Sequence, residues 1–158
     1  RRSGIAKKLT PDSLTGCEIS PAMLQFARKN AKKYGIDARY VQGNCMEMPF
    51  EDESFDSVIS NGSLHEWETP VRVFNEIYRV LRPGGRYCIT DLRRNVNLLA
   101  RYLGLATANP RAIRPGFISS LNAAYTVGEI TELLRNSDLK GAMVTTDFFG
   151  LCISGEKK

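Results

Sequence analysis

The sequence predicts an α/β fold built on a largely parallel sheet, and three observations lead to it. Short apolar segments alternate with longer amphipathic ones in the order strand, helix, strand, strand, helix, strand. The length of 158 residues suits one domain over residues 1–158. Hydrophobic residues at 42% and charged residues at 25% are typical of a globular chain, which excludes collagen-like, disordered and coiled-coil proteins.

The first strand and the first helix are predicted between residues 14 and 34. Residues 14–19 form a short apolar run, and Ser20 followed by Pro21 has the pattern of an N-cap with proline in the first turn. The helix continues to Tyr34, and Gly35 suits the left-handed position after a helix. Its predicted buried stripe consists of Met23, Leu24, Phe26, Ala27 and Ala31.

The middle of the chain predicts three strands and one helix. Residues 38–42 and 55–60 read as strands. Thr69-Pro70 repeats the pattern of a cap followed by proline and begins a helix, which Pro83-Gly84-Gly85 ends. Residues 86–90 then predict another strand.

Residues 92–125 interrupt this alternation. A helix is expected over residues 96–106, and Asn109-Pro110 and Arg114-Pro115-Gly116 are expected to break the pattern. Thr126 and Glu129 have capping-box spacing before a helix that reaches about residue 137. Two closing strands, near residues 141–146 and 149–154, are expected to form an antiparallel pair.

The charge and cysteine patterns narrow the class of protein. The net charge is +5, but the basic residues at 28–33 have the spacing of a solvated helix face, which is favoured over a nucleic-acid site. The four cysteines lie far apart and there is one histidine, His65, so no metal site is predicted. Free thiols suit a cytoplasmic protein. No apolar run approaches the ~18 residues of a membrane helix.

Polar residues stand at the predicted carboxyl ends of four strands, where open parallel sheets bind ligands. Glu18 can accept both hydroxyls of a ribose, although the dipole of the following helix also favours an acid there. Asn44 can face an adenine edge, although asparagine after glycine is also a common turn residue. Ser60-Asn61-Gly62 and Thr90-Asp91 end the other two strands.

Four segments resemble, in order and spacing, the class I S-adenosylmethionine-dependent methyltransferases, and most of all their small-molecule, quinone-biosynthesis branch. The segments are Glu18–Leu24, Val41–Phe50, Ser54–Ser60 and Tyr78–Gly85. The resemblance covers residues 1–91 well, is weaker over 92–125 and moderate over 126–154. It implies a Rossmann-like methyltransferase sheet, S-adenosylmethionine as cofactor, a small-molecule methyl acceptor, and a substrate cover at residues 92–125.

The resemblance also assigns contacts to the adenosine part of the cofactor. Glu18 would bind the ribose, and Ile19 would pack on the adenine face. Asn44 stands where the family usually has aspartate and would face the adenine amino group. Its carbonyl can accept that hydrogen bond but carries no charge. The backbone N–H of Cys45 would face an adenine ring nitrogen.

The methionine part of the cofactor would lie above the third strand end. By the resemblance, Ser60, Asn61 and Gly62 lie beneath the methionine moiety and the transferring methyl group. His65 follows shortly after and is the one candidate for a catalytic base or a methionine contact. The alternative is that His65 caps its loop or packs on Trp67.

One departure from the family is large. The glycine-rich G-x-G-x-G loop is absent, because the 13 glycines never occur as G-x-G. In the family this loop follows the first, central strand. We therefore expect a chain truncated at its N-terminus, in which a longer native chain, a partner or a swapped segment completes the sheet.

Two other function classes compete with methyl transfer. The missing loop keeps open a non-catalytic methyltransferase-like binding domain or a cofactor-dead fragment. An acid at a strand end also suits a nicotinamide-dependent oxidoreductase. The segment around Asn44, the Arg82–Gly85 motif and the closing strand pair argue against the oxidoreductase.

Overall fold

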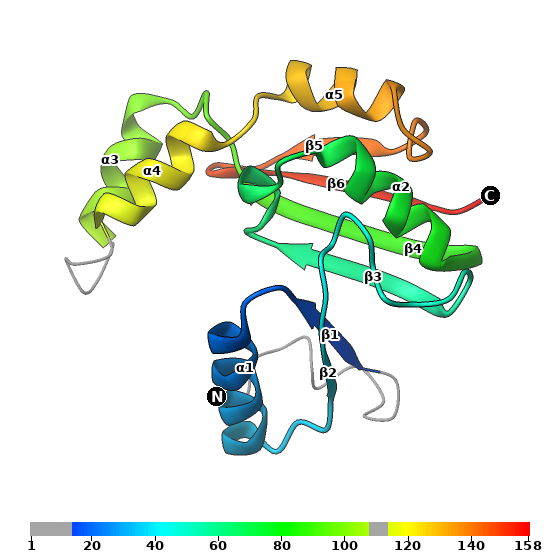
Figure 1. The fold of residues 1–158 in the computed structure, drawn as a ribbon. Helices are drawn as coiled ribbons and strands as arrows, with labels where there is room; N and C mark the ends of the chain where they lie inside the picture. The colour runs from blue at the N-terminus through cyan, green and yellow to red at the C-terminus, as the bar shows by residue number, and fades with distance from the viewer. Residues whose placement is uncertain (1–13, 108–113) are drawn as a thin grey trace. The chain divides into compact units, whose positions relative to one another are not determined.

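The computed structural model describes residues 14–107 and 114–158. The chain divides into two compact units, Arg1–Phe50 and Glu51–Lys158, each with helices and strands of its own (Figure 1). The mixed α/β composition confirms the predicted fold class. The prediction of a single domain over residues 1–158 stays a prediction.

The first unit contains one parallel strand pair and one helix. Strand β1 (Thr15–Glu18) pairs with β2 (Arg39–Gln42), and helix α1 (Pro21–Tyr34) connects them. The predicted caps are confirmed. The Ser20 hydroxyl accepts a hydrogen bond from the Met23 N–H at 3.3 Å, and Gly35 adopts a left-handed φ of 62°.

The predicted buried stripe of α1 is only partly right. Leu24 and Ala31 are buried, but Met23 and Phe26 are more than half exposed. Two residues along a helix correspond to a rotation of about 200°, so Phe26 points away from the side that carries Leu24. A two-stranded sheet covers only a narrow stripe of the helix.

The second unit is built on a four-stranded mixed sheet with the order β3-β4-β6-β5. Strand β3 (Phe55–Asn61) runs parallel to β4 (Leu81–Leu92). Strand β6 (Gly150–Glu156) is antiparallel to both β4 and β5 (Met143–Thr146). The antiparallel closing pair is therefore confirmed.

Two helices cover one side of this sheet (Figure 1). They are α2 (Pro70–Val80) and α5 (Val127–Arg135), which contact each other. Their buried side chains meet those of β4 and β6 in the core, whose members include Val73, Phe74, Ile77, Ile89, Ile130, Leu134 and Ile153. Pro70 lies in the first turn of α2 as predicted, but Thr69 makes no side-chain capping bond there.

The stretch over residues 92–125 contains two helices, α3 (Leu98–Thr107) and α4 (Arg114–Ala123). The expected break at Arg114-Pro115-Gly116 is wrong, because α4 begins there. Proline fixes a helical φ and has no N–H to lose in a first turn, so it begins this helix instead. The other expected break, at Asn109-Pro110, lies outside the described residues.

Strand β4 begins five residues earlier than predicted, at Leu81. The pairing with β3 shifts register between Phe55↔Leu81 and Ser57↔Arg86. The extra residues belong to the Arg-Pro-Gly-Gly motif, in which Gly84 has a φ of 77° that only glycine adopts freely. The motif therefore joins α2 to the strand through a local irregularity.

Within the described ranges, β1 pairs with β2 alone and β3 pairs with β4 alone. The predicted absence of a central strand stays a prediction. No helix among the described residues is long and apolar enough to cross a membrane.

Candidate functional site

Glu18 lies half-buried at the carboxyl end of β1, where it also supports the start of α1. Its Oε1 accepts a hydrogen bond from the Ser20 N–H at 2.8 Å. A carboxylate accepts through both of its oxygens, so this contact leaves capacity for a ribose hydroxyl. Both interpretations of Glu18, helix-start acid and ribose ligand, are compatible with this geometry.

Ile19 follows as an exposed apolar side chain, with 61% of its surface accessible. Its carbonyl accepts a hydrogen bond from the Gln42 Nε2 at 3.2 Å, which ties the ends of β1 and β2 together. An aliphatic group held next to a carboxylate in this way suits an adenosine, with ring and ribose side by side.

Asn44 and Cys45 form a tight turn after β2. The Asn44 Oδ1 accepts from the Met46 N–H at 2.9 Å, and its carbonyl accepts from the Glu47 N–H at 3.0 Å. Asn44 is therefore a turn residue, although its Oδ1 has a second lone pair. Cys45 is half-buried, and burial raises the pKa of its thiol.

In the second unit, Asn61 and Gly62 stand at the carboxyl end of β3, directly after the half-buried Ser60. The Asn61 Oδ1 accepts from the Thr90 hydroxyl at 2.7 Å, and the Gly62 N–H donates to the Thr90 carbonyl at 2.8 Å. Gly62 has a left-handed φ of 69°. The Thr90 hydroxyl thus bonds the carbonyl side of the Asn61 amide, and its NH2 group is the donor side.

His65 lies in the short 3-10 helix η2 (Leu64–Glu66) and is held by Asp91 of β4. The Nδ1 of His65 is 2.9 Å from both carboxylate oxygens of Asp91. The alternatives that His65 caps its loop or packs on Trp67 stay predictions. The Trp67 ring packs edge-on against Phe74. The sequence marked Asp91 as a strand-end acid, but nothing in it links the two residues.

Two arginines of the expected substrate cover are engaged within the protein. An Arg93 Nη2 donates to the Asp147 carbonyl at 3.4 Å, and Arg94 forms an ion pair with Glu129. Hydrogen bonds from the Gly150 and Phe149 N–H groups, with a smaller contribution from the Arg93 guanidinium, hold the pKa of Asp147 below its usual range. Arg93 and Arg94 therefore connect the stretch to α5 and to the turn between β5 and β6.

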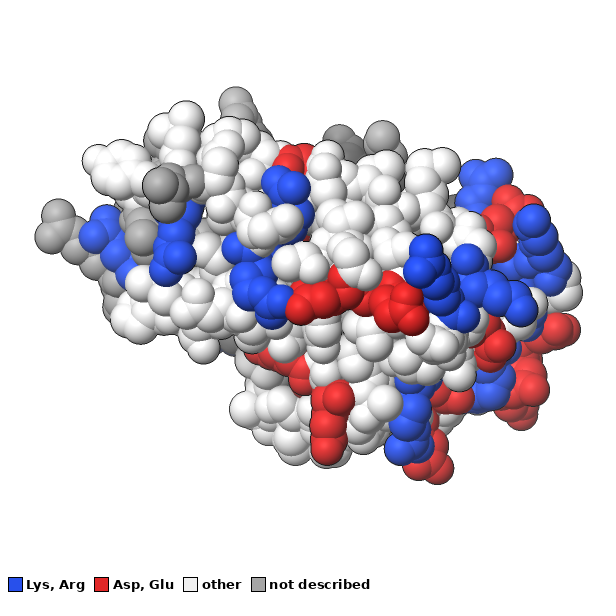
Figure 2. Space-filling model, turned by 90° about the horizontal axis from the view of Figure 1, so that it is seen from above, with Lys and Arg blue, Asp and Glu red and all other residues white. Residues whose placement is uncertain are grey.

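Charges of both signs lie next to one another on the face of Figure 2, most clearly at its centre and right. Ion pairs such as Arg79–Glu76, at 2.7 Å, are of this kind. Among the described residues, no group of three or more His, Cys, Asp or Glu could hold a metal ion.

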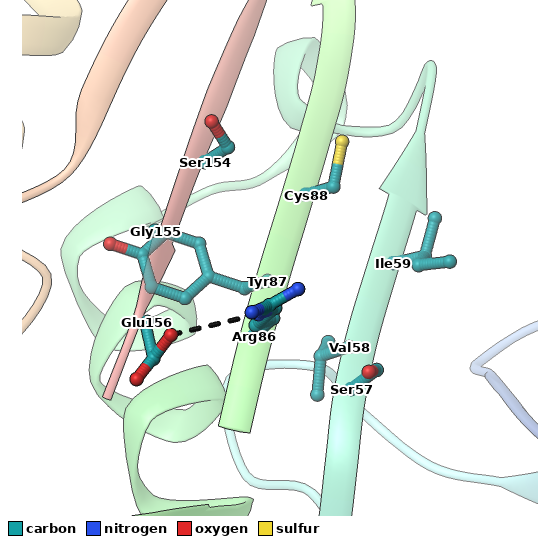
Figure 3. A pocket seen from close by; sticks show the side chains of 9 residues that line it. All are labelled: Ser57, Val58, Ile59, Arg86, Tyr87, Cys88, Ser154, Gly155 and Glu156. Carbon is teal, nitrogen blue, oxygen red and sulfur yellow. Dashed lines mark ion pairs between the residues drawn. The ribbon is translucent and has the colours of Figure 1, made fainter. Parts of the chain in front are cut away.

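A hollow of about 550 Å³ lies on the sheet of the second unit (Figure 3). It extends over Ser57–Ile59 and is crossed by the Arg86–Glu156 ion pair at 3.6 Å. No site residue predicted from the sequence lines it. The hollow is therefore separate from the strand ends that carry Asn61 and Asp91.

Comparison with known proteins gives the family. The methyltransferase domain family matches residues 3–89. A phthiotriol/phenolphthiotriol dimycocerosates methyltransferase of Mycobacterium tuberculosis is 34% identical over 111 residues, which are 70% of this chain and 40% of that protein. A chloroplastic 2-methyl-6-phytyl-1,4-hydroquinone methyltransferase 2 of Oryza sativa subsp. japonica is 36% identical over 86 residues, 54% of this chain and 24% of the relative. The chain thus spans less than half the length of either relative.

A solved structure agrees with the family match. The S-adenosylmethionine-dependent methyltransferase from Aquifex aeolicus aligns with a TM-score of 0.67 and 14% identity, over 92% of this chain and 69% of that one. This likeness concerns the fold, which is the Rossmann-like methyltransferase fold. Because the family match extends over more than half of the 158 residues and the fold agrees with it, the chain belongs to the S-adenosylmethionine-dependent methyltransferases.

Proposed function

We propose that the protein carrying this chain transfers the methyl group of S-adenosylmethionine to a small-molecule acceptor. The observation that carries the proposal is the polar set at the strand ends. In both units, the residues that match the family pattern stand at the carboxyl end of a parallel strand pair. The cofactor, when bound, supplies a methyl group already activated on a sulfonium, so the protein contributes mainly proximity and orientation.

Glu18, Ile19, Asn44 and Cys45 are proposed to bind the adenosine part of the cofactor. Glu18 accepts the ribose hydroxyls, and the exposed Ile19 packs on the adenine face. Asn44 accepts from the adenine amino group with its remaining lone pair, and the Cys45 N–H meets a ring nitrogen.

Ser60, Asn61 and Gly62 are proposed to bind the methionine part. Ser60 and Gly62 form the floor, with the positive φ of Gly62 bringing backbone close to the ligand. The free side of the Asn61 amide donates hydrogen bonds above the strand end.

The acceptor is proposed to be partly apolar. The two curated relatives are named for a dimycocerosate triol and a phytyl hydroquinone, both with long hydrocarbon parts. In the cover stretch, Leu99 and Tyr102 of α3 are 60% and 68% exposed. Exposed apolar side chains on a cover helix suit an apolar acceptor. Arg93 and Arg94 already contact other residues of the protein, so an anionic acceptor is less favoured.

A further strand, from this protein or swapped from a partner, is expected to pair with β3, whose Ile59 is largely exposed.

A reducing compartment such as the cytoplasm suits the four free cysteines. Two of them, Cys88 and Cys152, have their sulfur atoms 3.6 Å apart.

Calorimetry on the intact protein tests the proposal. Glu18→Ala removes two charge-assisted hydrogen bonds, each worth roughly 1.5–3 kcal/mol, so S-adenosylmethionine should bind at least about tenfold more weakly. Glu18→Gln is the matched control, because its amide oxygen still accepts the Ser20 N–H and preserves the start of α1. Unchanged affinity in Glu18→Ala would remove the ribose assignment. Binding without methyl transfer would favour the non-catalytic alternative.

A further inference from the structure

Cys88 and Cys152 lie side by side on β4 and β6, the two central strands of the sheet in the second unit. Their sulfur atoms are 3.6 Å apart, and one thiol donates a hydrogen bond to the other. Both residues are half-buried and both cysteines are free. Each is next in the chain to a fully buried isoleucine of the core, Ile89 or Ile153. Because side chains alternate along a strand, the two thiols lie on the face of the sheet opposite the core.

The register of β4 against β6 makes the two cysteines diagonal neighbours. Cys88 pairs directly with Ser154. Cys152 pairs directly with Thr90, two residues further along β4. The Cα atoms of diagonal neighbours lie about 7–8 Å apart, whereas those of a disulfide lie about 4.4–6.8 Å apart. The sulfur atoms are therefore in contact in the reduced protein, but a covalent bond between them requires β4 and β6 to shift against each other.

Thr90 connects this pair of thiols to the residues proposed to bind the methionine part of the cofactor. Its hydroxyl donates to the Asn61 Oδ1 at 2.7 Å, and its carbonyl accepts from the Gly62 N–H at 2.8 Å. Thr90 also stands directly opposite Cys152 in the ladder. A shift of β4 against β6 at this point would therefore move the residue that positions Asn61 and Gly62.

The hollow on the sheet gives a small reagent access to the pair (Figure 3). Cys88 is one of the residues that line this hollow of about 550 Å³. Its sulfur is therefore the expected first point of attack, and Cys152 is the thiol that reacts second. Burial raises the pKa of the Cys88 thiol, so this thiol is protonated at neutral pH and reacts slowly. The pair would respond to sustained oxidation rather than to a brief exposure.

We propose that Cys88 and Cys152 form a redox-sensitive pair whose oxidation to a disulfide weakens the binding of S-adenosylmethionine, a role that rests on the proposed methyl transfer. The oxidant is a low-molecular-weight disulfide of the glutathione class. The Cys88 thiolate attacks one of its sulfur atoms, so a mixed disulfide forms and one thiolate leaves. The Cys152 thiolate then attacks the Cys88 sulfur, the disulfide within the protein forms, and the second thiolate leaves. The two leaving thiolates take up the two protons of the cysteines, and the reagent gains the two electrons that the cysteines lose.

The first test uses the intact protein and does not depend on cofactor binding. The protein is incubated with oxidised glutathione at about pH 8.5, where a larger fraction of the thiols is ionised, and its peptides are mapped by mass spectrometry without reduction. The expected product is a pair of peptides linked through Cys88 and Cys152, which dithiothreitol returns to free thiols. A map without this linked pair, or with glutathione on Cys88 as the final product, would overturn the proposal.

Calorimetry with S-adenosylmethionine provides the second readout on the same samples. Displacement of a hydrogen-bonded ligand contact should make the oxidised protein bind at least about fivefold more weakly than the reduced protein, and dithiothreitol should restore the affinity. Cys88→Ala removes the first thiol, so its affinity should equal that of the reduced protein with or without oxidised glutathione. Cys17→Ala is the matched control, because it removes a half-buried cysteine but keeps the pair, and it should respond to oxidation as the unaltered protein does.

The outcomes separate this proposal from the function on which it rests. Failure of the reduced protein to bind S-adenosylmethionine would remove the proposed function, and the control of binding with it. Normal binding by the reduced protein and equal binding by the linked form would overturn the redox proposal alone. A loss of affinity on oxidation that persists in Cys88→Ala would assign the effect to other thiols and would also overturn it.

Discussion

At the scale of one residue, the Oδ1 of Asn44 makes a turn contact and is also proposed to make a ligand contact. Its Oδ1 holds the Met46 N–H at 2.9 Å and is also the proposed acceptor for the adenine amino group. Asn44→Asp keeps the turn contact and adds a charge. Hydrogen bonds to charged groups exceed neutral ones by about 1 kcal/mol, so S-adenosylmethionine should bind about fivefold more tightly.

Titration calorimetry of the intact protein would measure this gain. Asn44→Ala is the control, since it loses both contacts and should weaken binding. If Asn44→Asp bound no better than Asn44→Ala, the Oδ1 would serve the turn alone.

The sequence predicted the strand-end residues one by one, but not their pairing. Glu18 could be placed because it ends a recognisable strand, and Asn44 because it lies two residues after the next one. The partnership of His65 with Asp91 crosses 26 positions and depends on the register of β3 against β4. Register is set by long-range packing, which local patterns do not contain.

At the scale of elements, α5 shows a cap whose strength depends on pH. Glu129 accepts from the Thr126 N–H at 2.8 Å and pairs with Arg94, and these contacts hold the pKa of Glu129 below its ordinary value of 4.5. A carboxyl with a depressed folded pKa stabilises the protein above its unfolded pKa, and this contribution is lost as the pH falls through the folded pKa.

Glu129→Gln should therefore lower the free energy of unfolding by about 0.5 kcal/mol at pH 7 and by less at pH 3. Urea unfolding followed by circular dichroism at the two pH values measures this. Thr131→Ala serves as the control, because its hydroxyl donates to the Val127 carbonyl, which does not titrate, so its cost of about 1 kcal/mol should be equal at both. Equal losses for Glu129→Gln at pH 7 and pH 3 would contradict the charge-based explanation.

Element boundaries were predictable where capping chemistry is local. The caps of α1 are made by Ser20 and Gly35, and the capping box of α5 by Thr126 and Glu129. All four residues lie within a few positions of the helix ends that they cap. The break predicted at Arg114-Pro115-Gly116 was wrong because proline can begin a helix as well as end one. Which of the two occurs depends on what the helix packs against, and α4 packs against η2.

At the scale of the whole molecule, the order of the strands was harder to predict from the sequence than their existence. The alternation of elements predicted the α/β class, and the closing strands were correctly expected as an antiparallel pair. The insertion of β6 between β4 and β5 follows from contacts more than 50 residues apart in the chain. Such pairings are driven by burial of Ile89 and Ile153 at the centre of the sheet.

The stretch proposed as substrate cover should open more readily than this sheet. In α3, Leu99 and Tyr102 are mostly exposed, whereas Ile89 of β4 is fully buried and pairs with Ile153 of β6. Segments with little buried apolar surface open at low free energy, and active-site covers belong to this class.

Hydrogen exchange on the intact protein should therefore show the amides of α3 and α4 exchanging well before those of β3 and β4. Bound S-adenosylhomocysteine should slow exchange at the end of β3 more than within α3, because the cover meets the acceptor rather than the cofactor. Equal protection of α4 and β4 in the free protein would make residues 92–125 part of the rigid core and end their assignment as a cover.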